Sequence, residues 1–236
     1  MALKRVWIPS PNFSGRGGSS VRLIVLHTAE GARNYRDLGS FFQENVQASS
    51  HVGIDDTFNE IGEYVHRQDK AWTCASYNPY SVNAELCAFA GWSSAEWNNH
   101  ANMLANCAQW IAEESAHYGI PIVKLSASEA QGSGRGICQH KDLGVAGGGH
   151  SDCGPNFPID HVLDIARGGT PPKPEEIKDV AIATALTAGG TLEVFVEADD
   201  GSVWHTWQKK GETAWSGGKE GKQTAGLSKL CPPPGK

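Results

Sequence analysis

Residues 21–26 constrain the fold more than any other segment, because they form a continuous apolar, β-branched run that ends directly before His27. Such a run is typical of a β-strand that is buried on both faces of a sheet. Side chains at the carboxyl end of a buried strand emerge into a cleft. The run therefore predicts a strand that delivers His27 to a functional site.

Helices and short strands are predicted in the sequence after this strand. Apolar residues spaced as on one helix face predict a helix over Tyr35–Val46. A capping box formed by Ser93 and Glu96 opens a longer helix, predicted over Ser93–His117. Residues 1–20 are rich in Pro, Gly and Ser and are predicted to be irregular. The other predicted elements are strands around His51–Ile54, Phe58–Val65, Val82–Ala90 and 136–142, and a helix near Ile159–Ala166.

The pattern changes after residue 168, which we take as the end of a first, mixed α/β domain. Residues 169–178 form a Pro-rich linker, and from residue 179 apolar residues alternate with period two. Gly189-Gly190 and Asp199-Asp200-Gly201 separate the alternating runs as hairpin turns. Residues 179–236 are therefore predicted to form a small all-β meander, with a fourth strand at Thr213–Gly217 and a disordered tail from Lys219.

Composition excludes several classes of function. The net charge of −6 gives no basic surface for nucleic acid. No apolar run approaches the ~18–20 residues of a membrane span, so membrane insertion is not expected. Residues 1–7 lack the apolar core of a signal peptide, and we expect synthesis and folding in a cytoplasm. Six scattered cysteines are too few for a disulfide framework.

A set of potential metal ligands stands out among the nine histidines. His27 ends the buried strand, His140 lies in a short β-like run, and Asp152-Cys153 follows twelve residues later. Two histidines and one anionic ligand leave the fourth position of a zinc ion open, as metal-assisted hydrolysis requires. Because these residues are far apart in sequence, their spacing alone only suggests such a site. Five other histidines, at 66, 100, 117, 161 and 205, lie in ordinary surface or helical contexts.

Six segments in order resemble the N-acetylmuramoyl-L-alanine amidase family, which includes T7-lysozyme-like and peptidoglycan-recognition-protein-like domains. The resemblance covers residues 1–168 and looks strongest to endolysins of phages that infect mycobacteria and related actinobacteria. It implies a mixed central sheet flanked by helices, a zinc ion at the floor of a groove, and bacterial peptidoglycan as partner. The segments are Leu26-His27-Thr28, Ser49 to Ile54, Ala71-Trp72, Ser81 to Leu86, His140-Lys141-Asp142, and Ser151 to Pro158.

The resemblance implies a zinc ligand set. His27 and His140 match the two histidine ligands of the family, whose third ligand is Asp or Cys in different branches. The Asp branch reads Asp-Pro-Gly-Pro-x-Phe-Pro, and the segment from Asp152 to Pro158 fits that register with Cys153 in place of a proline. Asp152 is therefore favoured, and Cys153 stays open as the alternative because a thiolate binds zinc strongly.

The resemblance also implies catalytic residues. Glu85 matches the acidic residue that takes a proton from the attacking water and passes it to the leaving amine. It lies in an apolar stretch, where an unpaired carboxylate would be costly, so we favour function over a solvated strand glutamate. His150 stands where the family has a Lys that stabilises the oxyanion; contact with substrate is the alternative role.

Three further residues receive roles from these motifs. His51 and Trp72 are candidate substrate-binding residues in the groove, although His51 can instead serve packing. Asp142, two residues beyond His140, is a candidate hydrogen-bond partner for that ligand.

The function expected from the sequence is zinc-dependent hydrolysis of the amide between N-acetylmuramic acid and L-Ala, by an endolysin that reaches the wall through a separate route such as a phage-made membrane hole. The rivals are a recognition protein that binds peptidoglycan without cutting it, and a zinc peptidase that acts on the stem peptide. No nucleotide or redox cofactor is expected.

The C-terminal region resembles one repeat of a tectonin- or lectin-like β-propeller. A single blade cannot bury both faces, so it is expected to pack on the first domain or to self-associate. Three tryptophans are candidates for stacking on wall sugars or for filling a small core: Trp204, Trp207 and Trp215.

Overall fold

A computed structural model describes residues 3–44, 46–169, 182–186, 190–197, 203–208 and 228–231. The chain divides into two compact units, residues 1–172 and residues 173–236. Among the residues described, no helix has the length and apolar character needed to cross a membrane.

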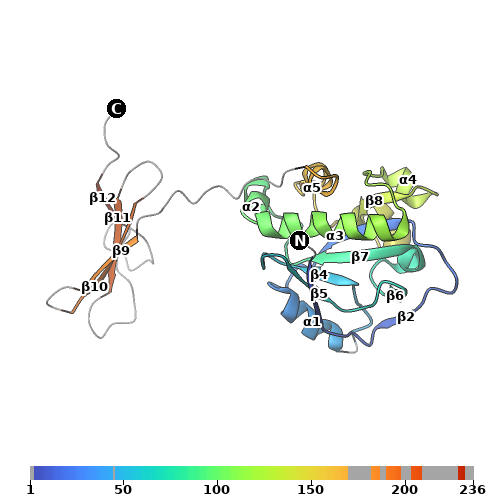
Figure 1. Cartoon of the computed structure of the whole chain (residues 1–236), viewed down its shortest axis with the longest axis horizontal. Coiled ribbons are helices and arrows are strands. Elements are labelled where there is room, and N and C mark those ends of the chain that lie inside the picture. Colours follow the sequence, from blue (N-terminus) through green and yellow to red (C-terminus); the bar gives the residue numbers. More distant parts are fainter. Residues whose placement is uncertain are drawn as a thin grey trace. The chain divides into compact units, whose positions relative to one another are not determined.

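The first unit is built on a mixed sheet of six strands in the order β1-β5-β4-β7-β3-β8 (Figure 1). All neighbours pair in parallel except β4 and β5, which are antiparallel. A separate antiparallel pair is formed by β2 (Phe13–Gly15) and β6 (Asp69–Ala71). The strands of the large sheet are β1 (Lys4–Trp7), β5 (Glu60–Glu63), β4 (Val52–Ile54), β7 (Ser81–Leu86), β3 (Leu23–Thr28) and β8 (Gly136–Gln139).

Strand β3 confirms the prediction made from the apolar run, and all of its residues are buried. Its side chains alternate between two hydrophobic clusters, with Ile24 and Leu26 in the larger and Leu23 and Val25 in the smaller. Because β3 pairs in parallel with both β7 and β8, the carboxyl ends of these three strands lie at the same edge of the sheet.

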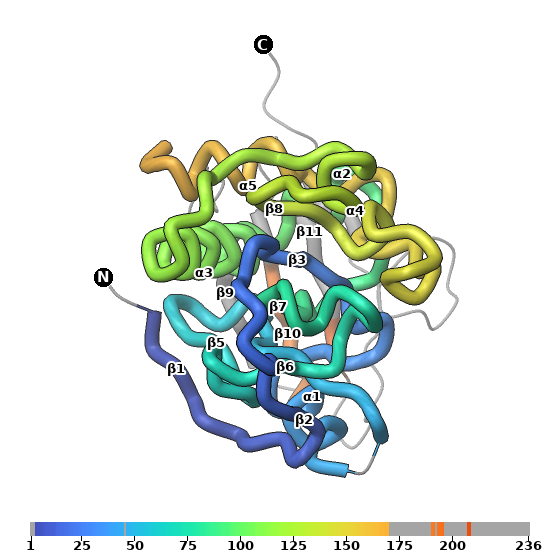
Figure 2. Tube along the Cα trace, turned by 90° about the vertical axis from the view of Figure 1, so that its right-hand side faces the viewer, coloured from blue at the N-terminus to red at the C-terminus, as the bar shows by residue number. Residues whose placement is uncertain are grey.

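Helices cover both faces of the sheet, as expected for a mixed sheet flanked by helices. Figures 1 and 2 show α3 and α5 on one side of the strands and α1 on the other. The α-helices are α1 (Tyr35–Gln43), α2 (Ser94–Asn98), α3 (Ala101–Tyr118), α4 (Ala127–Gln131) and α5 (Ile159–Ala166). Three 3-10 helices complete the unit: η1 (Ala75–Tyr80), η2 (His140–Leu143) and η3 (Val145–Gly147).

The helix predicted over Ser93–His117 is in fact two helices, α2 and α3, with a break before Ala101. A side chain distant in sequence stabilises the break: the Asp56 carboxylate accepts a hydrogen bond from the backbone N–H of Met103 at 3.0 Å and pairs with His100. The carboxylate satisfies a donor that the start of a helix leaves free. Gly119 ends α3 in the left-handed conformation, as expected.

The prediction that residues 1–20 are irregular is wrong at β1 and β2. Strand β1 lies at the edge of the sheet and pairs in parallel with β5. Its four residues are half-buried or exposed, so it lacks the apolar run that marks β3. Sequence patterns detect burial, and a short edge strand provides little of it.

Close packing over two glycines fixes α1 against the sheet. Gly53 and Gly62 face each other across β4 and β5, and the ring of Tyr64 lies over them. A Cβ at Gly53 would lie 2.0 Å from the Tyr64 hydroxyl oxygen, which leaves no room for a side chain. The same hydroxyl donates to the carbonyl of Tyr35 at the start of α1, at 2.6 Å.

The second unit contains an antiparallel sheet of four strands in the order β12-β11-β10-β9. Strands β9 (Ile182–Leu186), β10 (Leu192–Glu197) and β11 (Val203–Gln208) correspond to the three predicted alternating runs. The fourth strand is β12 (Ser228–Cys231), which lies in the tail predicted to be disordered. The predicted strand at Thr213–Gly217, Trp215 and the 170–178 part of the linker fall outside the described residues.

The cap on α3 gives a stability prediction. Replacing Asp56 by Ala removes the acceptor for the N–H of Met103, which should cost about 1 kcal/mol of unfolding free energy and lower the thermal midpoint by about 2–4 °C. The control is Asp164→Ala, which removes an exposed partner of Arg167 and should cost less than about 0.5 kcal/mol. Urea denaturation of both variants checks the difference. Equal losses would refute the capping role.

Candidate functional site

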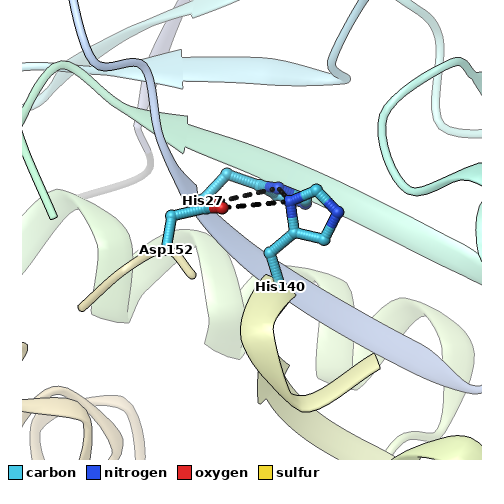
Figure 3. Close-up of side chains that lie close together, drawn as sticks. All are labelled: His27, His140 and Asp152. Atoms are coloured by element: carbon cyan, nitrogen blue, oxygen red, sulfur yellow. Dashed lines mark hydrogen bonds and ion pairs between the residues drawn. The ribbon is translucent and has the colours of Figure 1, made fainter. Parts of the chain in front are cut away.

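Three side chains from separate elements converge at the carboxyl edge of the sheet. His27 is near the end of β3, His140 follows β8 directly, and Asp152 lies in the loop after η3. Figure 3 shows the three pointing toward one another. We call them the His-His-Asp group. Their ligand atoms all lie within 4.8 Å of one another, and all three residues are buried.

The distances within the group are short. The Nδ1 atoms of His27 and His140 are 3.0 Å apart. One carboxylate oxygen of Asp152 lies 3.4 Å from Nδ1 of His27, and the other lies 3.2 Å from Nδ1 of His140. Three potential ligand atoms therefore face one small volume.

Hydrogen bonds on the far side of each ring decide which nitrogen carries the proton. Nε2 of His27 lies 3.1 Å from the side-chain oxygen of Asn83, and Nε2 of His140 lies 2.8 Å from the carbonyl of Gly147. Both oxygens are acceptors only, so each Nε2 must donate. A neutral imidazole that donates through Nε2 presents the lone pair of Nδ1, the form that ligates metals.

The group therefore fits a divalent cation by its own chemistry. Two imidazole lone pairs 3.0 Å apart, with a carboxylate between 3.2 and 3.4 Å from each, repel one another unless a proton or a cation lies among them. Two nitrogens and one oxygen are a common catalytic ligand set for zinc. No ligand set of this kind other than His27, His140 and Asp152 occurs among the described residues.

Burial and neighbouring charges adjust the protonation of the group. Burial lowers the pKa of His27, which keeps this ring neutral. Burial alone would raise the pKa of Asp152, but hydrogen bonds from the adjacent imidazoles, when a proton in place of a cation lies among the three groups, outweigh it and hold the pKa of this carboxyl well below its usual range. A neutral imidazole and an ionised carboxylate are the forms that bind metal.

Glu85 lies beside the group, on β7 and in register with His27 on β3. Its carboxylate is 4.0 Å from Nδ1 of His27, and 13% of its side chain is exposed. Burial, followed by the negative charges of Asp152 and Glu30, raises the pKa of Glu85 to about 8. Glu85 is thus a carboxyl that accepts a proton readily in the pH range where enzymes operate.

A cleft of about 770 Å³ opens over these residues. Its lining includes the His-His-Asp group, Glu85, Trp72, His150, part of α1, and segments 28–32, 47–49 and 147–148. The indole N–H of Trp72 donates to the hydroxyl of Ser14 at 3.1 Å, which fixes this ring in the wall. The lining residues include four carboxylates and no lysine or arginine, a charge balance that favours a cation at the cleft floor.

His150 lines the same cleft, is exposed, and stacks on the ring of His140 with 4.3 Å between ring centroids. Its ring is therefore close to the His-His-Asp group and open to solvent, a position from which it can reach a bound molecule.

His51, by contrast, is not among the residues that line the cleft. It is buried, its Nδ1 accepts from the backbone N–H of Asn83 at 3.0 Å, and its Nε2 lies 3.1 Å from the carbonyl of Asp69. Burial and the charge of Arg16 lower the pKa of His51 to about 3, so the ring is neutral. This position corresponds to the packing alternative and not to contact with substrate.

Cys153 also lies apart from the group. Its side chain is fully buried in the larger hydrophobic cluster, together with Trp97 and Phe157, and burial raises the pKa of its thiol well above the usual value. Cys138 belongs to the other cluster, and both thiols are free. The structure brings Asp152, not Cys153, to the two histidines.

Two hydrogen-bond partners of the histidines in this group were not expected from the sequence. Asp142 was expected beside His140, but its carboxylate accepts from the N–H of Gln139, and the carbonyl of Gly147 takes the place beside His140. Asn83, the partner of His27, was not singled out at all. A signal for Asn83 exists, because Ser81, Asn83 and Glu85 are polar at alternate positions of an otherwise apolar strand.

Comparison with known proteins gives one family match. The family model Amidase_2, described as N-acetylmuramoyl-L-alanine amidase, matches residues 17–155, which is more than half of the chain. That range contains the His-His-Asp group, Glu85 and His150. No curated protein sequence matches the chain at a significant level.

Solved structures with a similar fold include the Staphylococcus aureus hydrolase AmiA in complex with its ligand, at 21% identity and a TM-score of 0.54, covering 70% of this chain and 82% of that one. The catalytic domain of PlyG matches at 13% identity and a TM-score of 0.50, covering 72% of this chain and 95% of that one. At such identities the likeness concerns the fold alone.

The geometry predicts which residue completes the metal site. We expect the purified chain to bind one zinc ion, Asp152→Ala to lose most of that binding, and Cys153→Ala to retain it, because only Asp152 faces the two histidines. Metal analysis after dialysis and isothermal titration with zinc measure this, with circular dichroism as a check on folding. Loss of zinc from Cys153→Ala with retention by Asp152→Ala would reverse the assignment.

The raised pKa of Glu85 predicts a pH-dependent stability in the presence of a chelator. The folded chain holds the Glu85 proton up to a pKa of about 8, whereas the unfolded chain releases it near the ordinary glutamate pKa of 4.5. The contribution of Glu85 to the free energy of unfolding is therefore fully present at low pH and is lost as pH rises. Glu85→Gln should be more stable than wild type at pH 9 by on the order of 2 kcal/mol.

The difference in unfolding free energy between Glu85→Gln and wild type should become smaller as pH falls toward 5. Urea denaturation across this range measures it, with Glu44→Gln at an exposed position as control. A difference between wild type and Glu85→Gln that does not change with pH would contradict the assigned electrostatics.

Proposed function

This chain belongs to the N-acetylmuramoyl-L-alanine amidase family, and we propose that it hydrolyses the amide bond between N-acetylmuramic acid and L-Ala of bacterial peptidoglycan. The observation that carries the proposal is the convergence of His27, His140 and Asp152 at the floor of a cleft, with Glu85 alongside.

We propose zinc as the cofactor and these three residues as its ligands. Both imidazoles offer Nδ1 lone pairs, Asp152 offers a carboxylate, and three protein ligands leave a position free for water or substrate. A bound zinc ion supplies Lewis acidity, which polarises a carbonyl and lowers the pKa of water.

Glu85 is the proposed general base and acid. Water attacks the lactyl carbonyl carbon and transfers a proton to the Glu85 carboxylate. As the C–N bond breaks, Glu85 returns that proton to the amine of L-Ala, so that the products are a carboxylic acid and a free amine. A carboxyl whose pKa is raised toward the operating pH suits both transfers.

His150 and Trp72 are proposed to contact the substrate. His150 is exposed in the cleft beside His140, where a protonated imidazole donates to the oxyanion that develops at the attacked carbonyl. Trp72 presents an aromatic wall of the same cleft. Because the His51 ring does not line the cleft, we propose that it holds the backbone of Asn83 in place and does not contact the substrate.

Two other functions use the same cleft. A peptidoglycan-recognition protein would bind without cutting, and a zinc peptidase would cleave within the stem peptide. Glu85 favours an enzyme over a binding protein, because a largely buried carboxyl beside a metal-ligand group is costly unless it takes part in the chemistry.

The biological setting is proposed from the sequence resemblance. We propose an endolysin of a phage that infects mycobacteria or related actinobacteria, made in the host cytoplasm and acting on the host cell wall. The four-stranded C-terminal sheet has the strand number of one propeller blade, and we propose that this unit binds the wall or self-associates.

The activity is tested with purified peptidoglycan and mass spectrometry of the products. Wild type should release peptides that begin with L-Ala and leave the glycan strands intact. Glu85→Gln should keep zinc but lose turnover by at least about 100-fold, because general acid–base catalysis is removed while the ligands remain.

Each rival predicts a different result. Peptides that lack the N-terminal L-Ala would identify a peptidase, and binding with no release of peptide by zinc-loaded protein would identify a recognition protein. Unchanged turnover in Glu85→Gln would disprove the role of this carboxyl.

A further inference from the structure

We propose that Asn83 is a positioning residue for the metal site, because its side-chain amide fixes the ring of His27 so that Nδ1 presents its lone pair to the cation. The inference rests on the proposed function in that it assumes a metal at the His-His-Asp group. In this proposal Asn83 increases the affinity of the site for the metal and does not contact the substrate.

The placement of Asn83 follows from strand register. In β7 the side chains of Ser81, Asn83 and Glu85 point to one face of the sheet, while the alternate residues of the strand belong to the large hydrophobic cluster. His27 on β3 is in register with Glu85, and Val25 with Asn83. The Asn83 amide therefore lies on the same face of β7 as Glu85, two residues earlier in the strand, next to Nε2 of the His27 ring.

Hydrogen bonds fix the orientation of this amide. Its Nδ2 donates to the hydroxyl of Ser81 at 3.1 Å, and its Oδ1 accepts from the thiol of Cys74 at 3.4 Å. The oxygen is thereby held toward Nε2 of His27, 3.1 Å away. With the opposite orientation an N–H would face Nε2, and the proton of His27 would move to Nδ1, where it would block the metal.

The backbone of Asn83 is held as firmly as its side chain. Its N–H donates to Nδ1 of His51 at 3.0 Å, and its carbonyl accepts from the hydroxyl of Ser50 at 3.0 Å. His51 can accept there because its own Nε2 donates to the carbonyl of Asp69 at 3.1 Å. A chain of hydrogen bonds thus runs from Asp69 through His51 and Asn83 to His27.

The two histidine ligands differ in how they are held. Nε2 of His140 donates to the main-chain carbonyl of Gly147, whereas Nε2 of His27 donates to the side chain of Asn83. A single substitution can therefore release His27 but not His140. Removing the outer partner of a metal-ligating histidine typically costs 10–100-fold in metal affinity.

The first experiment measures zinc affinity of the full chain by competition with a chromophoric chelator. Asn83→Leu keeps the branched shape of the side chain but has no acceptor, and it should weaken zinc binding 10–100-fold. Asn83→Asp keeps an acceptor and should bind zinc within threefold of wild type. Asn106→Leu is the matched control: it removes another buried amide, one that donates to the carbonyl of Thr57 away from the cleft, and should also bind within threefold.

The second measurement separates positioning from a merely structural role. Nitrogen-15 chemical shifts of the imidazoles, recorded on metal-free protein, report which ring nitrogen of His27 carries the proton. Wild type and Asn106→Leu should show the Nε2–H form of His27, and Asn83→Leu should lose it. This test needs neither zinc nor turnover, so it still decides the role of Asn83 if the proposed metal or activity fails.

The proposal is supported if Asn83→Leu loses at least tenfold in zinc affinity while Asn83→Asp and Asn106→Leu do not. It is overturned if Asn83→Leu binds zinc like wild type, if Asn83→Asp is as weak as Asn83→Leu, or if His27 of wild type carries its proton on Nδ1. Should Asn83→Leu not fold, the protonation of wild-type His27 and the affinity of Asn83→Asp decide between these outcomes.

Discussion

The parallel pairing of β3 with both β7 and β8 is the constraint on which the rest of the site depends. This pairing carries His27, Glu85 and His140 to one edge of the sheet, although they are separated by more than 50 residues from each neighbour in the set. The apolar run in β3 drives the pairing, because only the centre of a covered sheet buries such a strand on both faces.

Electrostatics then gives this edge its chemistry. Two imidazole nitrogens and the carboxylates of Asp152 and Glu85 crowd a small volume at the floor of the cleft, and the repulsion among them is relieved by a proton or a cation. Burial, together with the negative charge of Asp152, raises the pKa of Glu85. A bound zinc ion would satisfy the lone pairs and leave Glu85 to handle protons.

The sequence predicts the parts of the fold and site that depend on local pattern, and it misses those set by distant contacts. Strand β3 and the candidacy of His27 follow from one apolar run. The break before α3 does not, because Asp56 causes it from outside the helix. Likewise, only the match to the family's sequence motif favoured Asp152 over Cys153 as a ligand. The burial of the Cys153 thiol in the core is visible only in the folded chain. Asn83 was missed because its partner lies on another strand.

The central claim is that two histidines and Asp152 hold one zinc ion, with no sulfur ligand. X-ray absorption spectroscopy at the zinc edge of the loaded full chain tests it most directly. The account predicts a shell of nitrogen and oxygen atoms only, at about 2.0–2.2 Å, with the outer scattering of two imidazole rings. A sulfur scatterer at about 2.3 Å, or a chain that retains no zinc at all, would contradict it.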